Sequence, residues 1–97
     1  METYLIVIGT TTTGYSAHCP DVLGCAAVGK TVNQVVANMK KALELHFEGI
    51  VEDGYPLPKP GGVDSYRDVM KDLDMDQYLL AHVQINTGRF ASLVSHS

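Results

Sequence analysis

Residues 24–31 read GCAAVGKT, and this string matches the phosphate-loop pattern G-x-x-x-x-G-K-[ST] at every position. A working phosphate loop needs a strand that ends before its first glycine, a bare backbone cradle between the glycines, and a helix that begins at the Lys-Thr pair. Only the last condition is met, because the preceding residues PDVL are typical of a turn and CAAV favours a β-strand. We therefore expect Gly29 to turn the chain from strand to helix and Thr31 to cap that helix.

Three short apolar segments in the N-terminal part of the chain predict an antiparallel meander. Residues 3–9 (TYLIVIG) are apolar on both faces, which indicates a strand in the middle of a sheet. Residues 15–19 alternate between apolar and polar side chains, as the returning arm of a hairpin does. Pro20 ends that strand, a type I turn is expected over residues 21–24, and residues 25–28 form the third strand.

Residues 31–53 change to the 3.6-residue period of an amphipathic helix. Thr31 and Gln34 have the spacing of a capping box at its start, and Gly54 is the residue type that commonly follows a helix end. Seven apolar side chains fall on one stripe, which must cover one face of the sheet. They are Val32, Val35, Val36, Met39, Leu43, Phe47 and Ile50.

The rest of the chain predicts an arm, a short helix and a last strand. Residues 55–62 (YPLPKPGG) contain three prolines and two glycines, so we expect an extended arm that crosses the surface. Residues 65–73 favour a short helix, and residues 79–86 alternate like a half-buried strand. The expected inward side chains are Val69, Met70 and Leu73 in the helix, and Leu79, Ala81, Val83 and Ile85 in the strand.

Together these segments predict an α+β fold in which a small antiparallel sheet of three to four strands is packed by one long helix. A chain of 97 residues buries one hydrophobic core, so we expect a single domain. Its expected parts are a core over 3–54, a proline-rich arm over 55–62, a C-terminal helix and strand over 65–86, and a tail over 87–97. This length also argues against a phosphate-loop hydrolase, since several parallel βα units do not fit.

The composition is that of an ordinary soluble domain. Hydrophobic residues make up 45% and charged residues 19%, which excludes general disorder. The net charge of −4 offers no clustered basic face for nucleic acid and suits a basic partner better. There is no apolar run of membrane-spanning length, and the start METYLIVIGT lacks secretory features. We therefore expect a cytoplasmic protein with reduced thiols at Cys19 and Cys25.

No arrangement of residues predicts an enzyme, a metal site or a cofactor. The expected strands carry almost no carboxylates at their ends, and no Ser-His-Asp or Cys-His set can be assembled. His18, Cys19 and Cys25 are three scattered side chains, whereas structural zinc needs four ligands in paired spacings.

The outer face of the long helix is the best candidate for a contact with another protein. Glu44, Glu48 and Glu52 repeat every four residues along one flank, which is typical of a solvated face or of a surface for a basic partner. Leu45 projects opposite the apolar stripe, among Lys41, Glu48 and Glu52. An apolar side chain in that position is tolerated singly or marks a contact.

Several short motifs follow one another in a distinctive order along residues 4–60. They are Gly14-Tyr15, Pro20-Asp21-Val22-Leu23-Gly24-Cys25, Gly29-Lys30-Thr31, Gly54 and Pro56-Leu57-Pro58. This order resembles the HicB-like antitoxin family, also described as the UPF0150 type. The pattern of that family runs from a strand through Gly-Tyr, a strand ending in Pro-Asp-Leu-x-Gly-Cys, a Gly-Asp-Thr that opens a helix, and a Gly followed by Pro-x-Pro.

The resemblance implies a degraded ribonuclease H-like domain without nuclease chemistry, which self-associates as a dimer or tetramer. It also implies a partner, a small basic mRNA-cleaving toxin of the HicA kind, which the protein neutralises by masking its surface. We expect the partner contacts on the helix flank and the arm, at Lys41, Glu44, Leu45, Glu48, Glu52, Pro56 and Pro58. The alternative is a solitary oligomeric domain that binds another protein or a small ligand.

The sequence departs from the family pattern in two places. Family members often carry an acidic residue at the end of the first strand, where Gly9 and Thr10 stand in this chain. Many members also carry a C-terminal ribbon-helix-helix or helix-turn-helix domain for operator binding. Only 21 residues follow Asp76, so we do not expect DNA binding by this chain alone.

Overall fold

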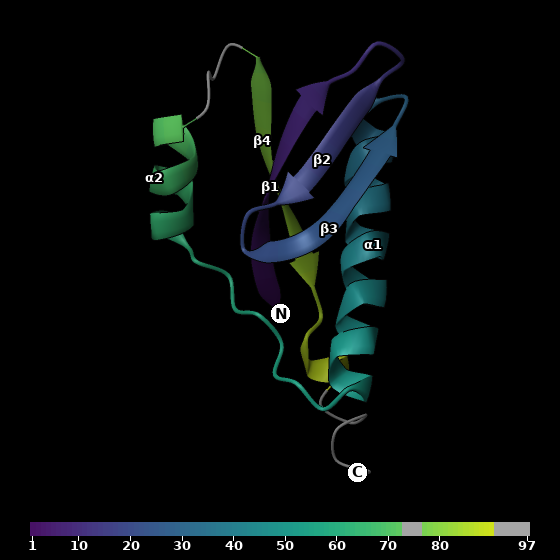
Figure 1. Cartoon of the computed structure of the whole chain (residues 1–97), viewed down its shortest axis with the longest axis vertical. Coiled ribbons are helices and arrows are strands. Elements are labelled where there is room, and N and C mark those ends of the chain that lie inside the picture. Colours follow the sequence, from purple (N-terminus) through teal and green to yellow (C-terminus); the bar gives the residue numbers. More distant parts are fainter. Residues whose placement is uncertain (73–76, 91–97) are drawn as a thin grey trace.

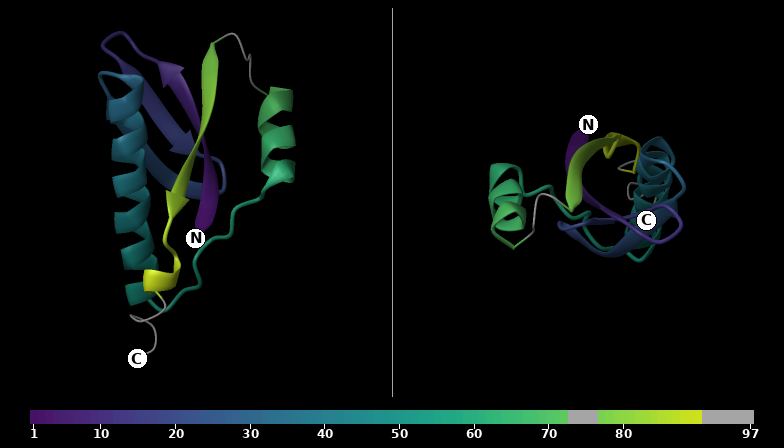
Figure 2. Two further views of the ribbon diagram at one scale, coloured as in Figure 1. Left: turned by 180° about the vertical axis from the view of Figure 1, so that it is seen from behind. Right: turned by 90° about the horizontal axis from the view of Figure 1, so that it is seen from above.

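The computed structural model describes residues 1–72 and 77–90. The elements follow in the order β1 (Glu2–Thr10), β2 (Tyr15–Cys19), β3 (Val22–Gly29), α1 (Val32–Glu52), α2 (Val63–Asp72) and β4 (Tyr78–Ile85). All strand pairs are antiparallel, and the sheet order is β3-β2-β1-β4. α1 covers one face of the sheet and α2 lies against the other (Figure 1, Figure 2). The predicted α+β fold, with a small antiparallel sheet packed by one long helix, is confirmed.

β1 occupies an interior position in the sheet, because it pairs with β2 on one side and with β4 on the other. Its side chains alternate between the two layers that cover the sheet. Tyr4, Ile6 and Ile8 are buried on the α1 side, whereas Leu5 and Val7 are buried beneath α2. The apolar run therefore belongs to a strand that is covered on both faces, as the sequence predicts.

The hairpin between β2 and β3 differs from the expected turn. Cys19 pairs directly with Val22. The connection therefore consists of Pro20 and Asp21. Gly24 lies inside β3 with a φ of +81°, near the point where the register between the strands shifts. A glycine in this left-handed region is typical of a β-bulge. The expectation of a type I turn that ends at Gly24 is thus wrong, because strand pairing resumes before it.

Both ends of α1 have the caps that the sequence predicts. The Thr31 hydroxyl accepts a hydrogen bond of 3.1 Å from the amide of Gln34. The Gln34 side chain in turn accepts one of 3.0 Å from the amide of Lys30, one residue before the usual capping-box donor. At the other end, Gly54 has a φ of +82°, and its amide donates to the carbonyl of Val51. This left-handed residue ends the helix in a Schellman motif.

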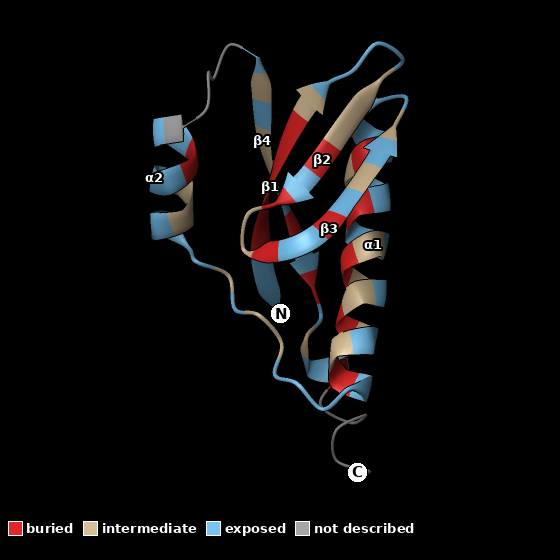
Figure 3. Ribbon diagram, in the orientation of Figure 1, coloured by how far each residue is buried: buried red, intermediate tan, exposed pale blue. Residues whose placement is uncertain are grey.

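The buried residues of α1 lie along the side of the helix that faces the sheet (Figure 3), and they form one apolar stripe. The buried members are Val35, Met39, Leu43, Phe47 and Val51. From the predicted stripe, Val32, Val36 and Ile50 are half-buried at its margins. Ile50 and Val51 both lie one turn beyond Phe47, so the helical period alone does not choose between them. No helix within residues 1–72 and 77–90 is long and apolar enough to cross a membrane.

The last two elements form where the sequence predicts them, but two of the side chains expected in the core are exposed. β4 begins one residue earlier than expected and pairs with β1, which makes the sheet four-stranded. Leu79 is 51% exposed near the start of this edge strand. In α2, Val69 is buried against the sheet, whereas Met70 is 53% exposed. Leu79 lies opposite Ile8 and shares the α1 side of the sheet, as predicted, but it is not covered there. The inward assignment of Met70 is wrong, and Leu73 lies outside the described residues.

An aromatic cluster closes one end of the core between β1, α1 and the segment that follows β4. Phe90 is buried, and its ring lies edge-on to that of Phe47 with the centroids 6.1 Å apart. The ring of Tyr4 tilts against Phe47 from the other side, at 5.3 Å. Aromatic pairs in such geometries add to the free energy of their burial. The cluster holds the chain after β4 against the C-terminal half of α1.

Candidate partner-binding surfaces

The GCAAVGKT segment forms the end of a strand and the start of a helix. Residues 26–29 pair with β2. A glycine is required at position 29 because the backbones pack closely here, and not because of a positive φ. A Cβ at this position would lie 2.6 Å from the backbone nitrogen of Val35. The Asn38 side chain donates a hydrogen bond of 2.8 Å to the carbonyl of Val28, which ties β3 to α1. The Gly-Lys-Thr part of the phosphate-loop pattern is therefore explained by close packing at Gly29 and by the helix cap at Thr31, without a bound phosphate.

The exposed side of α1 carries five of the predicted contact residues. We call this surface the acidic flank, and it comprises Lys41, Glu44, Leu45, Glu48 and Glu52. Leu45 is 64% exposed, and the first and last members of the flank are exposed as well. All five are neighbours at helical spacings of three or four residues, so they share one face along about 16 Å of the helix.

Arg89 neutralises part of the acidic flank. Its Nη1 lies 3.2 Å from Oε2 of Glu44, and its Nη2 lies 3.1 Å from Oε1 of Glu48. The same guanidinium group is 4.9 Å from the ring centroid of Phe90. Glu52 forms no ion pair with any residue in the described ranges. The sequence did not reveal this pairing, because Arg89 is separated from the two glutamates by 45 and 41 positions.

The proline-rich arm is tied to the sheet. The Tyr4 hydroxyl donates a hydrogen bond of 2.6 Å to the carbonyl of Pro58. Burial, with a smaller effect from the charge of Glu2, raises the pKa of Tyr4 to about 12, so this hydroxyl remains a hydrogen-bond donor even in strongly basic solution. Pro56 is exposed and Pro58 is half-buried, and both line a cavity of about 350 Å³ at the end of α1. The arm thus continues the surface of α1 beyond Glu52.

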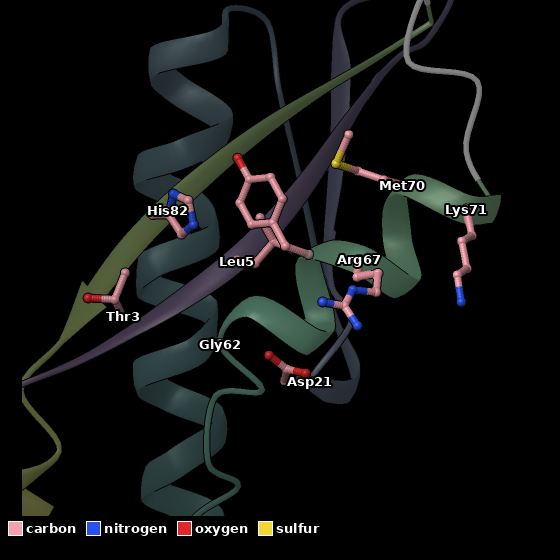
Figure 4. A pocket seen from close by; sticks show the side chains of 9 residues that line it. Thr3, Leu5, Asp21, Gly62, Arg67, Met70, Lys71 and His82 are labelled. Carbon is pink, nitrogen blue, oxygen red and sulfur yellow. The ribbon is translucent and has the colours of Figure 1, made fainter.

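A groove between α2 and the sheet has no counterpart among the sequence-based predictions (Figure 4). Its volume is about 700 Å³. The main lining residues are Leu5, Asp21, Tyr66, Arg67, Met70 and His82. The rings of Tyr66 and His82 stack with their centroids 5.5 Å apart. An apolar wall with a few charged groups at its edge is typical of a site for a small ligand or a peptide.

Asp21 holds one end of this groove together. Its Oδ2 accepts a hydrogen bond of 2.9 Å from the amide of Gly61, and its Oδ1 accepts one from the Ser65 hydroxyl. The carboxylate therefore joins the β2–β3 connection to the arm and to the first turn of α2, where a negative charge is favourable. The sequence indicated only a turn residue at this position, since a local pattern contains no signal for a contact 40 positions away.

Cys19 and Cys25 are buried free thiols. Burial raises the pKa of Cys19 to about 11, and it also raises the pKa of Cys25. A thiol that keeps its proton is a poor nucleophile and a poor metal ligand. Within residues 1–72 and 77–90, no three or more His, Cys, Asp or Glu side chains are grouped so as to hold a metal ion.

Comparison with known proteins gives a consistent set of relatives. The chain matches the family described as HicB_like antitoxin of bacterial toxin-antitoxin system over residues 4–95. An uncharacterized 14.9 kDa protein of Haemophilus phage HP1 is 38% identical over 63 residues, which are 65% of this chain and 47% of the phage protein. The crystal structure of antitoxin HicB3 is 30% identical with a TM-score of 0.72, over 87% of this chain and 62% of that chain. A chain of the HicA3 and HicB3 toxin-antitoxin complex is 29% identical with a TM-score of 0.70, over 87% and 98% of the two chains.

The chain therefore belongs to the HicB-like antitoxin family of bacterial toxin-antitoxin systems. Its four-stranded antiparallel sheet and long helix match the fold of the HicB antitoxin structures. The chain spans about half the length of the curated relatives it matches, 47% of the phage protein and 58% of a UPF0150 protein of Synechocystis.

Proposed function

We propose that this protein is an antitoxin that neutralises a small basic mRNA-cleaving toxin of the HicA kind by masking its RNA-binding and catalytic surface. The support is the family membership together with an acidic flank on a rigid helix and a net charge of −4. Acidic surfaces attract basic partners and speed their association. We also propose that the protein is a single ribonuclease H-like domain that acts in the cytoplasm by binding, without enzymatic activity.

The exposure of Leu45 is the observation on which the location of this contact depends. Its side chain is 64% exposed in the middle of the acidic flank. Protein interfaces draw most of their free energy from a few central anchors, which a polar rim surrounds. Leu45 has the position of such an anchor, with Glu48 and Glu52 in the rim. Lys41 lies at the N-terminal end of this rim.

The ion pairs of Arg89 influence where a basic toxin makes its first contact. Glu44 and Glu48 already have a cationic partner, whereas Glu52 has none among the described residues. We place the centre of the contact between Leu45 and Glu52. Pro56 and Pro58 extend it along the arm, which adds a surface that loses little conformational entropy on binding.

The test is a calorimetric titration of the purified protein with the HicA-like toxin that it accompanies. We expect a stable complex at micromolar concentration and low salt. We expect Leu45→Ala to weaken the affinity about tenfold, because truncation of an interface anchor costs about 1–2 kcal/mol.

Leu23→Ala is the matched control, because Leu23 is 88% exposed on β3 and lies outside the acidic flank. It should leave the affinity unchanged. Failure of the wild-type protein to bind the toxin at low salt would contradict the antitoxin proposal. If Leu45→Ala and Leu23→Ala changed the affinity for the toxin equally, the location of the contact on α1 would be contradicted, but the antitoxin proposal would stand.

The groove beside α2 supports a second candidate, a solitary oligomeric domain that binds another protein or a small ligand. Its volume of about 700 Å³ falls within the range of small-molecule sites. In this case we expect shifts of the Tyr66 and His82 resonances in an NMR screen of small acidic aromatic compounds. Under either candidate we propose that the protein self-associates as a dimer or tetramer.

A further inference from the structure

The two edges of the sheet differ in how they are protected. β3, at one edge, contains the bulge at Gly24, and the Asn38 side chain donates a hydrogen bond to the carbonyl of Val28. β4, at the other edge, pairs with β1 alone in the part of the chain that the structure describes. Bulges, charges, prolines and covering side chains are the usual means by which proteins prevent an edge strand from pairing with another chain.

Among residues 1–72 and 77–90, nothing gives β4 such protection. Its sequence YLLAHVQI contains no proline, no glycine and no Asp, Glu, Lys or Arg over eight residues. Its register with β1 runs without a shift through eight residue pairs. A long, regular and uncharged edge strand offers free amides and carbonyls to a further strand. The exposed side chains of Leu79, His82 and Gln84 lie along the same strand.

We propose that β4 pairs in antiparallel fashion with β4 of a second copy, so that two four-stranded sheets join into one continuous sheet. A two-fold axis brings residues near the middle of the strand opposite themselves or their near neighbours. A charged side chain there would face its own charge, which destabilises a strand pair. The absence of Asp, Glu, Lys and Arg near the middle of β4 therefore suits pairing with a copy, whereas pairing with a different protein would not require it.

This arrangement also gives a partner to the exposed Leu79. Opposite residues of two paired strands point to the same face, so odd-numbered positions of one copy face odd-numbered positions of the other. Those positions in β4 are Leu79, Ala81, Val83 and Ile85, which are all apolar. Leu79 then packs against an apolar side chain of the second copy. On the opposite face, His82 of the second copy adds a side chain to the groove beside α2.

The experiment compares His82→Glu, His82→Lys and an equimolar mixture of the two by sedimentation equilibrium. The wild-type protein should sediment at twice the 10.5 kDa of one chain or at a higher even multiple. Each variant alone should sediment at half the wild-type mass, because like charges meet at the axis. The mixture should recover the wild-type mass, which also demonstrates that both variants fold despite losing the stack on Tyr66.

Ala26→Glu is the matched control, since Ala26 is exposed on β3 at the opposite edge and should retain the wild-type mass. The inference rests on the self-association proposed above and is independent of toxin binding. A wild-type monomer at high micromolar concentration would overturn both self-association and this surface. Wild-type mass in both His82 variants, or its loss in Ala26→Glu, would overturn the β4 surface alone. A monomer whose toxin complex is broken by His82→Glu would assign β4 to the toxin and overturn self-pairing.

Discussion

At the scale of single residues, the fold raises the pH at which two ionisable side chains lose their protons. Tyr4 and Cys19 are 1% and 2% exposed. Burial disfavours their charged forms and raises the pKa of Tyr4 to about 12 and that of Cys19 to about 11. Nearby charges, including that of Asp21, add to both shifts. In the unfolded chain both groups lose their protons at lower pH than in the folded chain.

We expect the free energy of unfolding to fall as the pH rises from 9 to about 11. In this range the unfolded chain releases the proton of Cys19 while the folded chain retains it, so the unfolded state binds fewer protons and stability decreases with pH. Urea denaturation at a series of pH values measures the slope. Cys19→Ala should reduce the dependence of the free energy of unfolding on pH. Val22→Ala, which also removes buried volume, should lower the free energy of unfolding at every pH but leave its dependence on pH unchanged. An unaltered slope in Cys19→Ala would contradict this assignment.

At the scale of secondary-structure elements, α1 owes its boundaries to local interactions. The hydroxyl of Thr31 satisfies the amide of Gln34 in the first turn, and Gly54 ends the helix in the left-handed region. These interactions involve residues within five positions of one another, and that is why the sequence predicts the helix to within a residue at each end. The acidic flank follows from the same helical period.

Thr31→Ala should lower the free energy of unfolding by about 1 kcal/mol, because the first turn of α1 loses its cap. Thr31→Ser keeps the hydroxyl and should retain nearly all of that stability. Urea denaturation at neutral pH measures both variants. If the two substitutions cost the same, the methyl group of Thr31 and not its hydroxyl bond stabilises this end of the helix.

At the scale of the whole molecule, Asp21 connects the β2–β3 connection to a segment about 40 positions further along the chain, which comprises the arm and the start of α2. Its carboxylate accepts hydrogen bonds from Gly61 and Ser65, and it thereby fixes the arm and α2 against the β2–β3 connection. Val69 is the one buried apolar side chain described in α2. A helix with so small a buried surface depends more on its polar contacts than α1 does.

We expect Asp21→Ala to speed amide hydrogen exchange in the arm and in α2 about tenfold or more, because hydrogen bonds to a charged acceptor contribute about 1.5–3 kcal/mol. Exchange in α1 should stay unchanged. Asp68→Ala is the control, since Asp68 is an exposed acid of α2 without a hydrogen bond among the described residues. Faster exchange throughout the molecule would show that Asp21 supports the global fold and does not act on α2 alone.

The sequence alone specified the strand at 3–9, the helix that begins after Thr31, the arm and the acidic flank, because periodicity, caps and prolines act over a few neighbouring residues. It also carried the ordered motifs of the family. Tertiary structure alone decided the pairing of Arg89 with the acidic flank, the contact of Asp21 with α2, and the exposure of Leu79. A pattern of apolar residues shows which side chains avoid water, but the path of the whole chain determines which distant element covers them or leaves an edge open.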